Sequence, residues 1–570
     1  MHATGGDVEL PAISRRRFLS VALGTATAGG VLLAGGLLES CASTPVAKST
    51  ARRVSSRETP QIRVVDVSGV DPDEQLMLAC LQGLANRMKP TVYLLGVAGG
   101  ENSSEKADEV WLKDAVPLRA GESTVDDLLS LSSSAAKGLV IWDPSLAVHT
   151  QNVATTMAGA LGALPVSPQL ASKMGASPYG LPVLADLRDL HLKTSTAAYT
   201  WALQQMASKK LDVPGPPAWI GDIGDGTTVR SCLRDWIVAV GGFAFEIYPE
   251  RSGELAFLTT MLESFPSHPA VFGYLYYDDK VYRESGIALN EYMSVRALSE
   301  SNRSMVATNT AGNLSVYSRF TAPVQHPRWD ETPRSPEGGK TYVALAVTDG
   351  DNVAYDLERM RVRYWDDPLR GTIPLGFSVS VWLPRLAPLA WEYYVRTMTD
   401  QECFVAGPSG AGYAYPSEIP DLQAYLALTN QMMSEAGLSG VWILDHNTLY
   451  PPSTPIVSAY VKALSPSIIL AQYGGFPAAQ ASPPAVALVD GVPVAHAARA
   501  TTVEGAVSAI EATAAAESPA GRTGAKFAFV ALDAWTMSYQ AAHEIMSRLG
   551  HGYEAVGLDT FAGMVKAAFR

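Results

Sequence analysis

An alternation of apolar runs with helical segments over residues 341–570 is the feature that most constrains how this chain folds. Eight runs rich in apolar or β-branched residues follow Lys340, at 342–348, 373–382, 403–406, 440–444, 467–472, 492–497, 526–532 and 553–557. Each run leads, directly or through a loop, into residues with apolar side chains at helical spacing. The pattern predicts a TIM-barrel-like (β/α)8 domain over 341–570, with a doubly wound sheet as the alternative because periodicity does not show closure.

Smaller units of the same kind precede this domain. Residues 62–95 have the pattern of a strand, a helix and a second strand, and we predict an α/β domain over 61–213. The proline- and glycine-rich string 214–217 marks a boundary, and we expect a second α/β region over 214–325. A linker follows at 326–340. The predicted fold class is therefore α/β, with two or more small N-terminal domains ahead of the TIM-barrel-like domain.

The N-terminal segment predicts export from the cytoplasm. Residues 14–19 read Ser-Arg-Arg-Arg-Phe-Leu, which fits a twin-arginine signal, and a glycine-rich apolar stretch follows over 21–38. A lipobox-like Leu-Glu-Ser-Cys ends it, so we predict a signal peptide over 1–41 with lipidation at Cys41; a permanent transmembrane anchor is the alternative. Residues 42–60 are expected to form a flexible tether. The protein would then lie in the cell envelope, lipid-anchored on the outer face of the cytoplasmic membrane, or be secreted.

Charge and cysteine content exclude several classes of partner. The signal carries three arginines and three acids, so the mature chain keeps the net charge of -13 and has no basic patch for nucleic acid. The remaining Cys80, Cys232 and Cys403 are too widely spaced for a zinc cluster, while one disulfide or three thiols stay open. No later apolar run approaches the roughly 18 residues of a membrane span, so we expect membrane contact through the lipid anchor only. The sequence indicates no oligomeric state.

Acidic side chains follow several of the predicted barrel strands. The first run ends at Asp349 and Asp351, the fourth at Asp445, and the seventh at Asp533. In a (β/α)8 barrel these positions line the catalytic face. Hydrolysis of a glycosidic bond needs one carboxyl group that protonates the leaving oxygen and another that attacks or activates water. We predict Asp445 and Asp533 as the catalytic pair, because they close opposite sides of the eight-strand count, with Asp349 and Asp351 next.

Other interpretations of these acids stay open. An aspartate after a strand often caps a helix or forms a turn, and for any single residue this role weighs as much as catalysis. Asp349 and Asp351 also suit a divalent cation, together with His446 or His496, as in a metal-dependent hydrolase or deacetylase. No cofactor is predicted, and a divalent metal belongs to this alternative only. A non-catalytic glycan-binding lipoprotein is the third interpretation.

A glycine- and tyrosine-rich string after the third run is the most distinctive motif. Residues 410–416 read Gly-Ala-Gly-Tyr-Ala-Tyr-Pro. The glycines let the backbone bend tightly and approach a ligand, while Tyr413 and Tyr415 supply stacking faces and hydroxyl groups. The alternative is a rigid loop whose tyrosines fill a seam between domains. The predicted substrate-binding residues are Gly412, Tyr413, Tyr415, Glu418, His446, Tyr473 and Trp535.

This string matches, letter for letter, the motif that names the GxGYxYP family of glycoside hydrolases, which the chain resembles. Residues 81–87, 311–316 and 348–352 are also similar to segments of that family. The resemblance implies N-terminal α/β modules ahead of a TIM-barrel-like domain, over nearly the whole mature chain. It also implies sugar processing, with a carbohydrate polymer or oligosaccharide as partner and, for an exported chain, an extracytoplasmic glycan as substrate.

Overall fold

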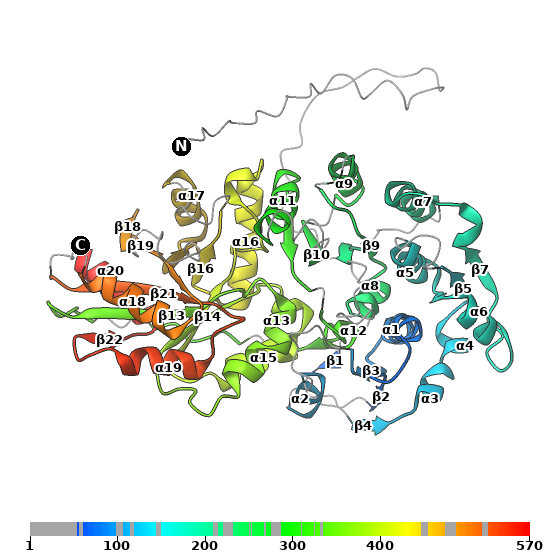
Figure 1. The fold of residues 1–570 in the computed structure, drawn as a ribbon, viewed down its shortest axis with the longest axis horizontal. Helices are drawn as coiled ribbons and strands as arrows, with labels where there is room; N and C mark the ends of the chain where they lie inside the picture. Colours follow the sequence, from blue (N-terminus) through cyan, green and yellow to red (C-terminus); the bar gives the residue numbers. More distant parts are fainter. Residues whose placement is uncertain are drawn as a thin grey trace, which may run out of the picture. The chain divides into compact units, whose positions relative to one another are not determined.

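The C-terminal part of the chain is built on one large, curled sheet (Figure 1). In the computed structural model the described residues are 54–55, 61–97, 107–114, 119–143, 150–208, 215–220, 232–249, 251, 253–266, 269–274, 287–308, 310–323, 325–330, 334–445, 454–472, 486–515 and 523–569. The sheet has the order β18-β19-β17-β16-β15-β14-β13-β21-β20, and β22 pairs with β13. All of these pairs are parallel except β18 with β19.

The strands of the curled sheet are β13 (Thr341–Val347), β14 (Leu375–Val379), β15 (Glu402–Ala406), β16 (Gly440–Ile443), β17 (Ile468–Ala471), β18 (Val486–Val489), β19 (Val492–His496), β20 (Ala498–Ala500), β21 (Lys526–Leu532) and β22 (Tyr553–Ala555). Every residue of β13 is buried, which is typical of a parallel strand covered on both faces. The strands therefore read as continuous apolar runs in the sequence.

Helices follow the strands of this sheet along the chain. They are α13 (Val353–Glu358), the π-helical turn η2 (Arg361–Trp365), α14 (Leu383–Leu386), α15 (Pro388–Thr397), η3 (Pro416–Glu418), α16 (Leu422–Ala436), α17 (Thr454–Leu464), α18 (Val503–Ala515), α19 (Tyr539–Arg548) and α20 (Leu558–Phe569). Local sequence sets their ends. The Asp421 side chain accepts from the Ala424 N–H at the start of α16, and left-handed Gly437 ends this helix.

The sheet curls, but its pairing departs from the strand order of a regular eight-stranded barrel. β19 pairs with β17, while β20, separated from β19 by Ala497, pairs with β21. β21 pairs directly with β13 along its whole length, so the eighth predicted strand, β22, does not lie between them. Instead, β22 pairs with the start of β13 and β14 pairs with its end. The structure thus shows a curled half-barrel sheet rather than the order that a (β/α)8 barrel predicts.

Three small parallel sheets precede the curled sheet in the described part of the chain, with the orders β3-β2-β4, β6-β5-β7 and β11-β10-β8-β9. Their strands are β2 (Gln61–Asp66), β3 (Val92–Leu95), β4 (Arg119–Glu122), β5 (Leu139–Ile141), β6 (Leu164–Val166), β7 (Val183–Asp186), β8 (Pro217–Ile220), β9 (Phe243–Phe245), β10 (Ala270–Tyr274) and β11 (Ser304–Val306). The predicted domain 61–213 therefore contains two separate sheets. Within the predicted tether, β1 (Val54–Ser55) pairs with β12 (Phe320–Thr321).

The helices of this N-terminal part are α1 (Pro72–Ala85), α2 (Ala107–Asp114), α3 (Val125–Leu129), α4 (Ser132–Ala135), α5 (Thr150–Leu161), α6 (Pro168–Gly175), η1 (Leu187–Leu190), α7 (Ser195–Ser208), α8 (Arg234–Val240), α9 (Glu254–Leu262), α11 (Ile287–Glu300) and α12 (Leu314–Tyr317). Among the described residues, no helix has the length and apolar character to cross a membrane. Residues 47–570 form one compact unit.

Two buried asparagines join the first and third small sheets. Asn313 lies in the left-handed region at φ 60° and exchanges hydrogen bonds of 2.9 and 2.8 Å with the backbone of Leu94. Its Oδ1 also accepts from Gln82 Nε2 at 2.6 Å. Asn86 forms a second link by donating to the Ser315 hydroxyl at 2.9 Å. Two of the strings that resemble the family thus meet through buried amides, which have to be paired because no water reaches them.

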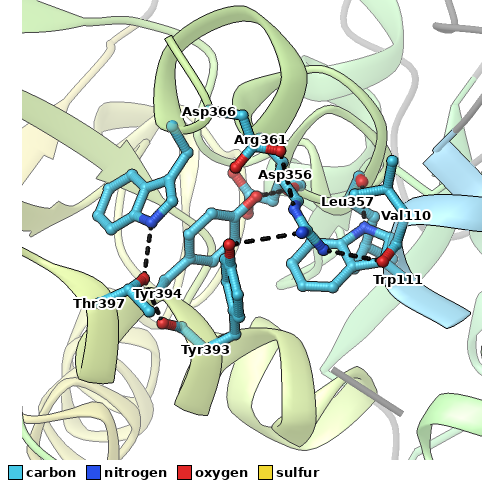
Figure 2. A network of polar contacts seen from close by, with 10 residues as sticks. Val110, Trp111, Asp356, Leu357, Arg361, Asp366, Tyr393, Tyr394 and Thr397 are labelled. Carbon is cyan, nitrogen blue, oxygen red and sulfur yellow. Dashed lines mark hydrogen bonds and ion pairs between the residues drawn. The ribbon is translucent and has the colours of Figure 1, made fainter. Parts of the chain in front are cut away.

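A second junction ties α2 to the segment that leaves β13 (Figure 2). The Arg361 guanidinium lies over the rings of Trp111 and Tyr393, at 4.5 and 4.4 Å from their centroids. It also donates to the Val110 carbonyl at 3.2 Å, and Trp111 Nε1 donates to the Leu357 carbonyl at 2.5 Å. Such cation–π contacts are strongest when they are shielded from water, as this buried arginine is. The first N-terminal domain therefore holds the start of the C-terminal domain.

Asn313→Ala is expected to lower the free energy of unfolding by about 3 kcal/mol or more, because several buried hydrogen bonds are lost and alanine is strained at φ 60°. Urea unfolding followed by tryptophan fluorescence measures the change. Asn302→Ala is the matched control, since Asn302 is also left-handed, at φ 55°, but exposed. A loss no larger than that of the control would contradict the role of Asn313.

Candidate active site

The chain turns sharply where β13 ends. Asp349 lies in the left-handed region at φ 61°, and the Thr348 hydroxyl donates to its carboxylate. Gly350 follows at a position where a Cβ would lie 2.0 Å from the Ser378 backbone carbon, and its N–H donates to Ser378 Oγ at 2.9 Å. Glycine is therefore required beside β14. The turn brings two acids to this strand end, Asp349 and the buried Asp351, with one residue between them in the sequence.

Burial strengthens proton binding by both carboxyl groups. It raises the pKa of Asp349 to about 6, although the Thr348 hydroxyl and the positive Arg499 oppose the shift. Burial also raises the pKa of Asp351 well above its ordinary value, and the negative charges of Asp349 and Glu291 add to this effect. Two neighbouring carboxyl groups in such a site do not both ionise freely near neutral pH. The pair can therefore hold a proton for transfer, which is what a general acid does.

Asp533, after β21, is held by an arginine and by its own turn. Arg499 donates to Oδ2 of Asp533 through Nε, at 3.2 Å, and through Nη2. Oδ1 accepts from the N–H groups of Trp535 and Thr536, at 3.1 and 3.0 Å, and from the Thr536 hydroxyl. From the sequence, a turn-forming role was the alternative to catalysis for this aspartate, and Asp533 has that role in the structure.

Asp445, after β16, anchors the motif loop. Its Oδ1 accepts from the N–H and the hydroxyl of Ser417, at 3.0 and 2.6 Å. Ser417 lies in η3, which begins at the last residue of the motif, Pro416. Both members of the pair predicted first, Asp445 and Asp533, thus have structural hydrogen bonds, and their catalytic role stays a prediction.

The motif loop passes so close to its neighbours that two of its residues have to be glycine. At Gly410, with φ 130°, a Cβ would lie 2.4 Å from Thr429 Cγ2 on α16. At Gly412, with φ 128°, it would lie 2.8 Å from the Met305 carbonyl oxygen. Met305 and Tyr413 exchange backbone hydrogen bonds of 2.8 and 2.7 Å. The glycines therefore let the motif pair with β11 of the third small sheet.

The two motif tyrosines fill the seam that this pairing creates. Tyr413 and Tyr415 are 5% and 3% exposed, and their ring centroids lie 5.8 Å apart. Tyr415 packs on Tyr292 of α11 at 5.6 Å, and the Tyr413 hydroxyl donates to Glu291 Oε1 at 2.9 Å. This is the seam arrangement that the sequence left open, and it does not present the two rings as an open wall for stacking on a sugar.

Family models match most of the chain. Three N-terminal models of the GxGYxYP family match residues 61–118, 136–210 and 221–319, and a model described as "GxGYxYP putative glycoside hydrolase C-terminal domain" matches 339–566. The chain belongs to the GxGYxYP family. The first two family domains fall within the single domain predicted over 61–213.

A solved structure shares the fold of this GxGYxYP protein. It is described as a "putative hydrolase" from Bacteroides thetaiotaomicron VPI-5482, with a TM-score of 0.73 and 24% sequence identity. The match covers 91% of this chain and 96% of that one, so the small domains and the curled sheet occur together in both. No curated protein matches the chain.

Glu291, in the third family domain, is an acid of this site that the sequence did not indicate. Its two carboxylate oxygens accept hydrogen bonds of 2.9 Å from the hydroxyls of Tyr274 and Tyr413. Glu291 lies in a helix, far along the chain from the strand ends where we expected catalytic groups. The useful signal would have been the motif itself, because a buried Tyr413 hydroxyl needs an acceptor.

The remaining predicted residues have varied surroundings. Trp535 is half-buried against Tyr355, at 5.4 Å between ring centroids, and beneath Arg359, at 5.0 Å. Glu418 is half-buried in η3. Across the described ranges, no group of three or more His, Cys, Asp or Glu side chains is arranged to hold a metal ion. Three predicted residues lie outside the described residues: Cys41, His446 and Tyr473.

Gly412→Ala is expected to lower the free energy of unfolding by about 2 kcal/mol or more, because the new Cβ meets the Met305 carbonyl and the backbone is strained at positive φ. Gly69→Ala is the matched control, since nothing lies within 4 Å of a Cβ there. Urea unfolding at neutral pH compares the two. Equal stability of the variants would contradict the tight backbone approach.

Asp349→Asn tests the raised pKa through the pH dependence of stability. Because the native state binds this proton more tightly, wild-type stability falls as the pH rises from about 4 to about 6, where the pKa of Asp349 lies. Asparagine carries no charge to bury. The variant should therefore exceed the wild type by on the order of 2–3 kcal/mol at pH 7.5 and by much less at pH 4. Denaturant unfolding at both pH values measures the difference.

Asp66→Asn is a control of opposite sign. The Ser68 N–H donates to Asp66 at 2.9 Å and lowers the pKa of this exposed carboxyl group. Its contribution to stability is present above the unfolded-state pKa and lost as the pH falls. The Asp66 variant should therefore lose stability at pH 7.5 but not at low pH. A gain for Asp349→Asn that does not change with pH would rule out the buried charge as its cause.

Proposed function

We propose that the protein is a glycoside hydrolase that acts on an extracytoplasmic glycan, with the Asp349–Asp351 pair as its proton donor. The observation that carries this proposal is the turn after β13. It holds two aspartates with one residue between them, and burial raises the pKa of both. The description of the matching C-terminal family model as a "putative glycoside hydrolase" supports the same reaction.

Cleavage of a glycosidic bond needs an acid that is still protonated near neutral pH. Asp351 fits this requirement best, because its pKa is raised well above its ordinary value by burial and then by the charges around it. Asp445 and Asp533 instead fix the motif loop and the turn after β21. We therefore assign the proton mainly to Asp351, with Asp349 as the partner that keeps it there.

The place of action rests on the N-terminal segment. A twin-arginine signal over 1–41 and a lipid on Cys41 would hold the protein on the outer face of the cytoplasmic membrane. Substrates there are polymers outside the cytoplasm. The curled sheet would serve as a TIM-barrel-type catalytic domain, since its candidate acids lie at the carboxyl ends of strands.

Asp351→Asn is expected to lower kcat/KM by about a hundredfold or more on any glycan that the wild type hydrolyses, because the leaving oxygen loses its proton donor. A panel of cell-wall, arabinogalactan-type and plant polysaccharides, assayed for release of reducing ends by the mature chain, provides the substrate. Asp490→Asn is the control, since it makes the same substitution at an exposed aspartate outside the acid pair.

Turnover by Asp351→Asn within about tenfold of the wild type would contradict the assignment. Loss of activity on chelation, restored by zinc or manganese, would instead support the metal-dependent hydrolase or deacetylase. Binding of a glycan without turnover by the wild type would support the non-catalytic alternative.

A further inference from the structure

We infer that Glu291 is the second catalytic carboxylate of this site and works opposite the Asp349–Asp351 pair. The inference rests on the proposed glycoside hydrolase function. It means that the third N-terminal domain supplies part of the active site, and that the site is formed where this domain meets the curled sheet.

Two hydroxyl donors from different segments hold the Glu291 carboxylate in place. Tyr274, at the end of β10, donates to Oε2, and Tyr413 of the motif donates to Oε1, both at 2.9 Å. A carboxylate oxygen that accepts one hydrogen bond still has a lone pair for a second contact. The side chain is half-buried, so it is not sealed inside the protein. Glu291 is thus fixed in position but keeps the capacity to act on a bound sugar or water.

Glu291 also lies within electrostatic reach of the proposed proton donor. Burial is the largest cause of the raised pKa values of Asp349 and Asp351, and the negative charge of Glu291 also raises both. Burial is also the largest cause of the raised pKa of Tyr413, and the charges of Glu291 and Asp351 contribute to a smaller extent. Tyr413 therefore senses a carboxyl group from each of two domains, Glu291 through a hydrogen bond and Asp351 through its charge.

The contrast with Asp533 separates a functional carboxylate from a structural one. Asp533 is paired with Arg499 and has hydrogen bonds from its own turn. Among the residues that the structure describes, Glu291 accepts hydrogen bonds from hydroxyl groups only, and no cation forms an ion pair with it. A carboxyl group without a neighbouring cation is suited to face a positively charged transition state, such as the oxocarbenium-like one of glycosidic cleavage.

The reaction then balances with water as co-reactant. The proton of the acid pair moves to the glycosidic oxygen. The bond between this oxygen and the anomeric carbon breaks, and the electron pair of that bond stays with the leaving oxygen. The carbon receives an electron pair from a Glu291 oxygen, forming a glycosyl ester that water later hydrolyses, or from a water whose proton passes to Glu291.

The test compares Glu291→Gln with Glu300→Gln in the full mature chain, on the glycan found by the polysaccharide panel. Glu300 is the matched control because it lies on the same helix but is exposed and pairs with Arg296 at 2.8 Å. Glu291→Gln should lower kcat by about a hundredfold or more, and Glu300→Gln should leave it unchanged. Tyr274→Phe and Tyr413→Phe, which each remove one hydrogen bond to the carboxylate, should lower kcat by about tenfold. Melting temperatures show that each variant is folded.

Two readouts distinguish catalysis from a structural role. In Glu291→Gln the alkaline limb of the pH profile should move to lower pH, because the charge that helps to keep the acid pair protonated is gone. In Glu291→Ala, added azide or formate should restore turnover if Glu291 attacks carbon directly. Rescue, or a shifted limb without rescue, supports the inference with Glu291 as nucleophile or as base. A large loss with neither effect means that Glu291 acts on the fold and overturns it.

The other outcomes separate this inference from the function on which it rests. If Asp351→Asn is inactive while Glu291→Gln keeps turnover within about tenfold of the wild type, the glycoside hydrolase stands and the role of Glu291 is overturned. If the wild type hydrolyses no glycan of the panel, the proposed function fails and the assignment of Glu291 falls with it.

Discussion

The backbone pairing of Tyr413 with Met305 is the contact on which the candidate site depends. It joins the motif loop to β11, and it is formed only because Gly412 has no side chain to meet the Met305 carbonyl. Once the loop is held there, the Tyr413 hydroxyl reaches Glu291 on α11. The carbonyl of Ala411 is fixed in the same loop by hydrogen bonds from Ser304 and Trp382. A motif that the sequence marks as a ligand loop is thus also the link between two domains.

Much of the fold was predictable because parallel strands buried on both faces leave long apolar runs in the sequence. The first and seventh predicted runs, for example, became β13 and β21 within one residue of their expected bounds. The order of the strands was not predictable, since β13 pairs directly with β21 across a long separation in sequence. The sequence also did not separate the sheet β6-β5-β7 from the sheet β3-β2-β4, because a pattern along the chain does not show which strands pair.

The candidate site was predictable only where local sequence carries the chemistry. Asp349 and Asp351 follow a strand, and the strand end alone marks them as candidates. The role of Asp533 depends on an arginine 34 positions away, and that of Asp445 on a serine 28 positions away. Glu291 meets Tyr413 across 122 positions, from another domain. Such contacts follow from the packing of domains, which no pattern along a single sequence expresses.

The N-terminal domains have a physical reason to be attached to this sheet. The turn that bears Asp349 is strained and buries charge, so the structure around it has to hold it in place. Part of that support comes from outside the C-terminal domain: the Val353 N–H, at the start of α13, donates to the Ala307 carbonyl at 2.9 Å. Arg361 then fastens the end of the same segment against Trp111 of α2. Because both ends of the segment after the acidic turn are held by other domains, separating those domains from the sheet would release the turn itself.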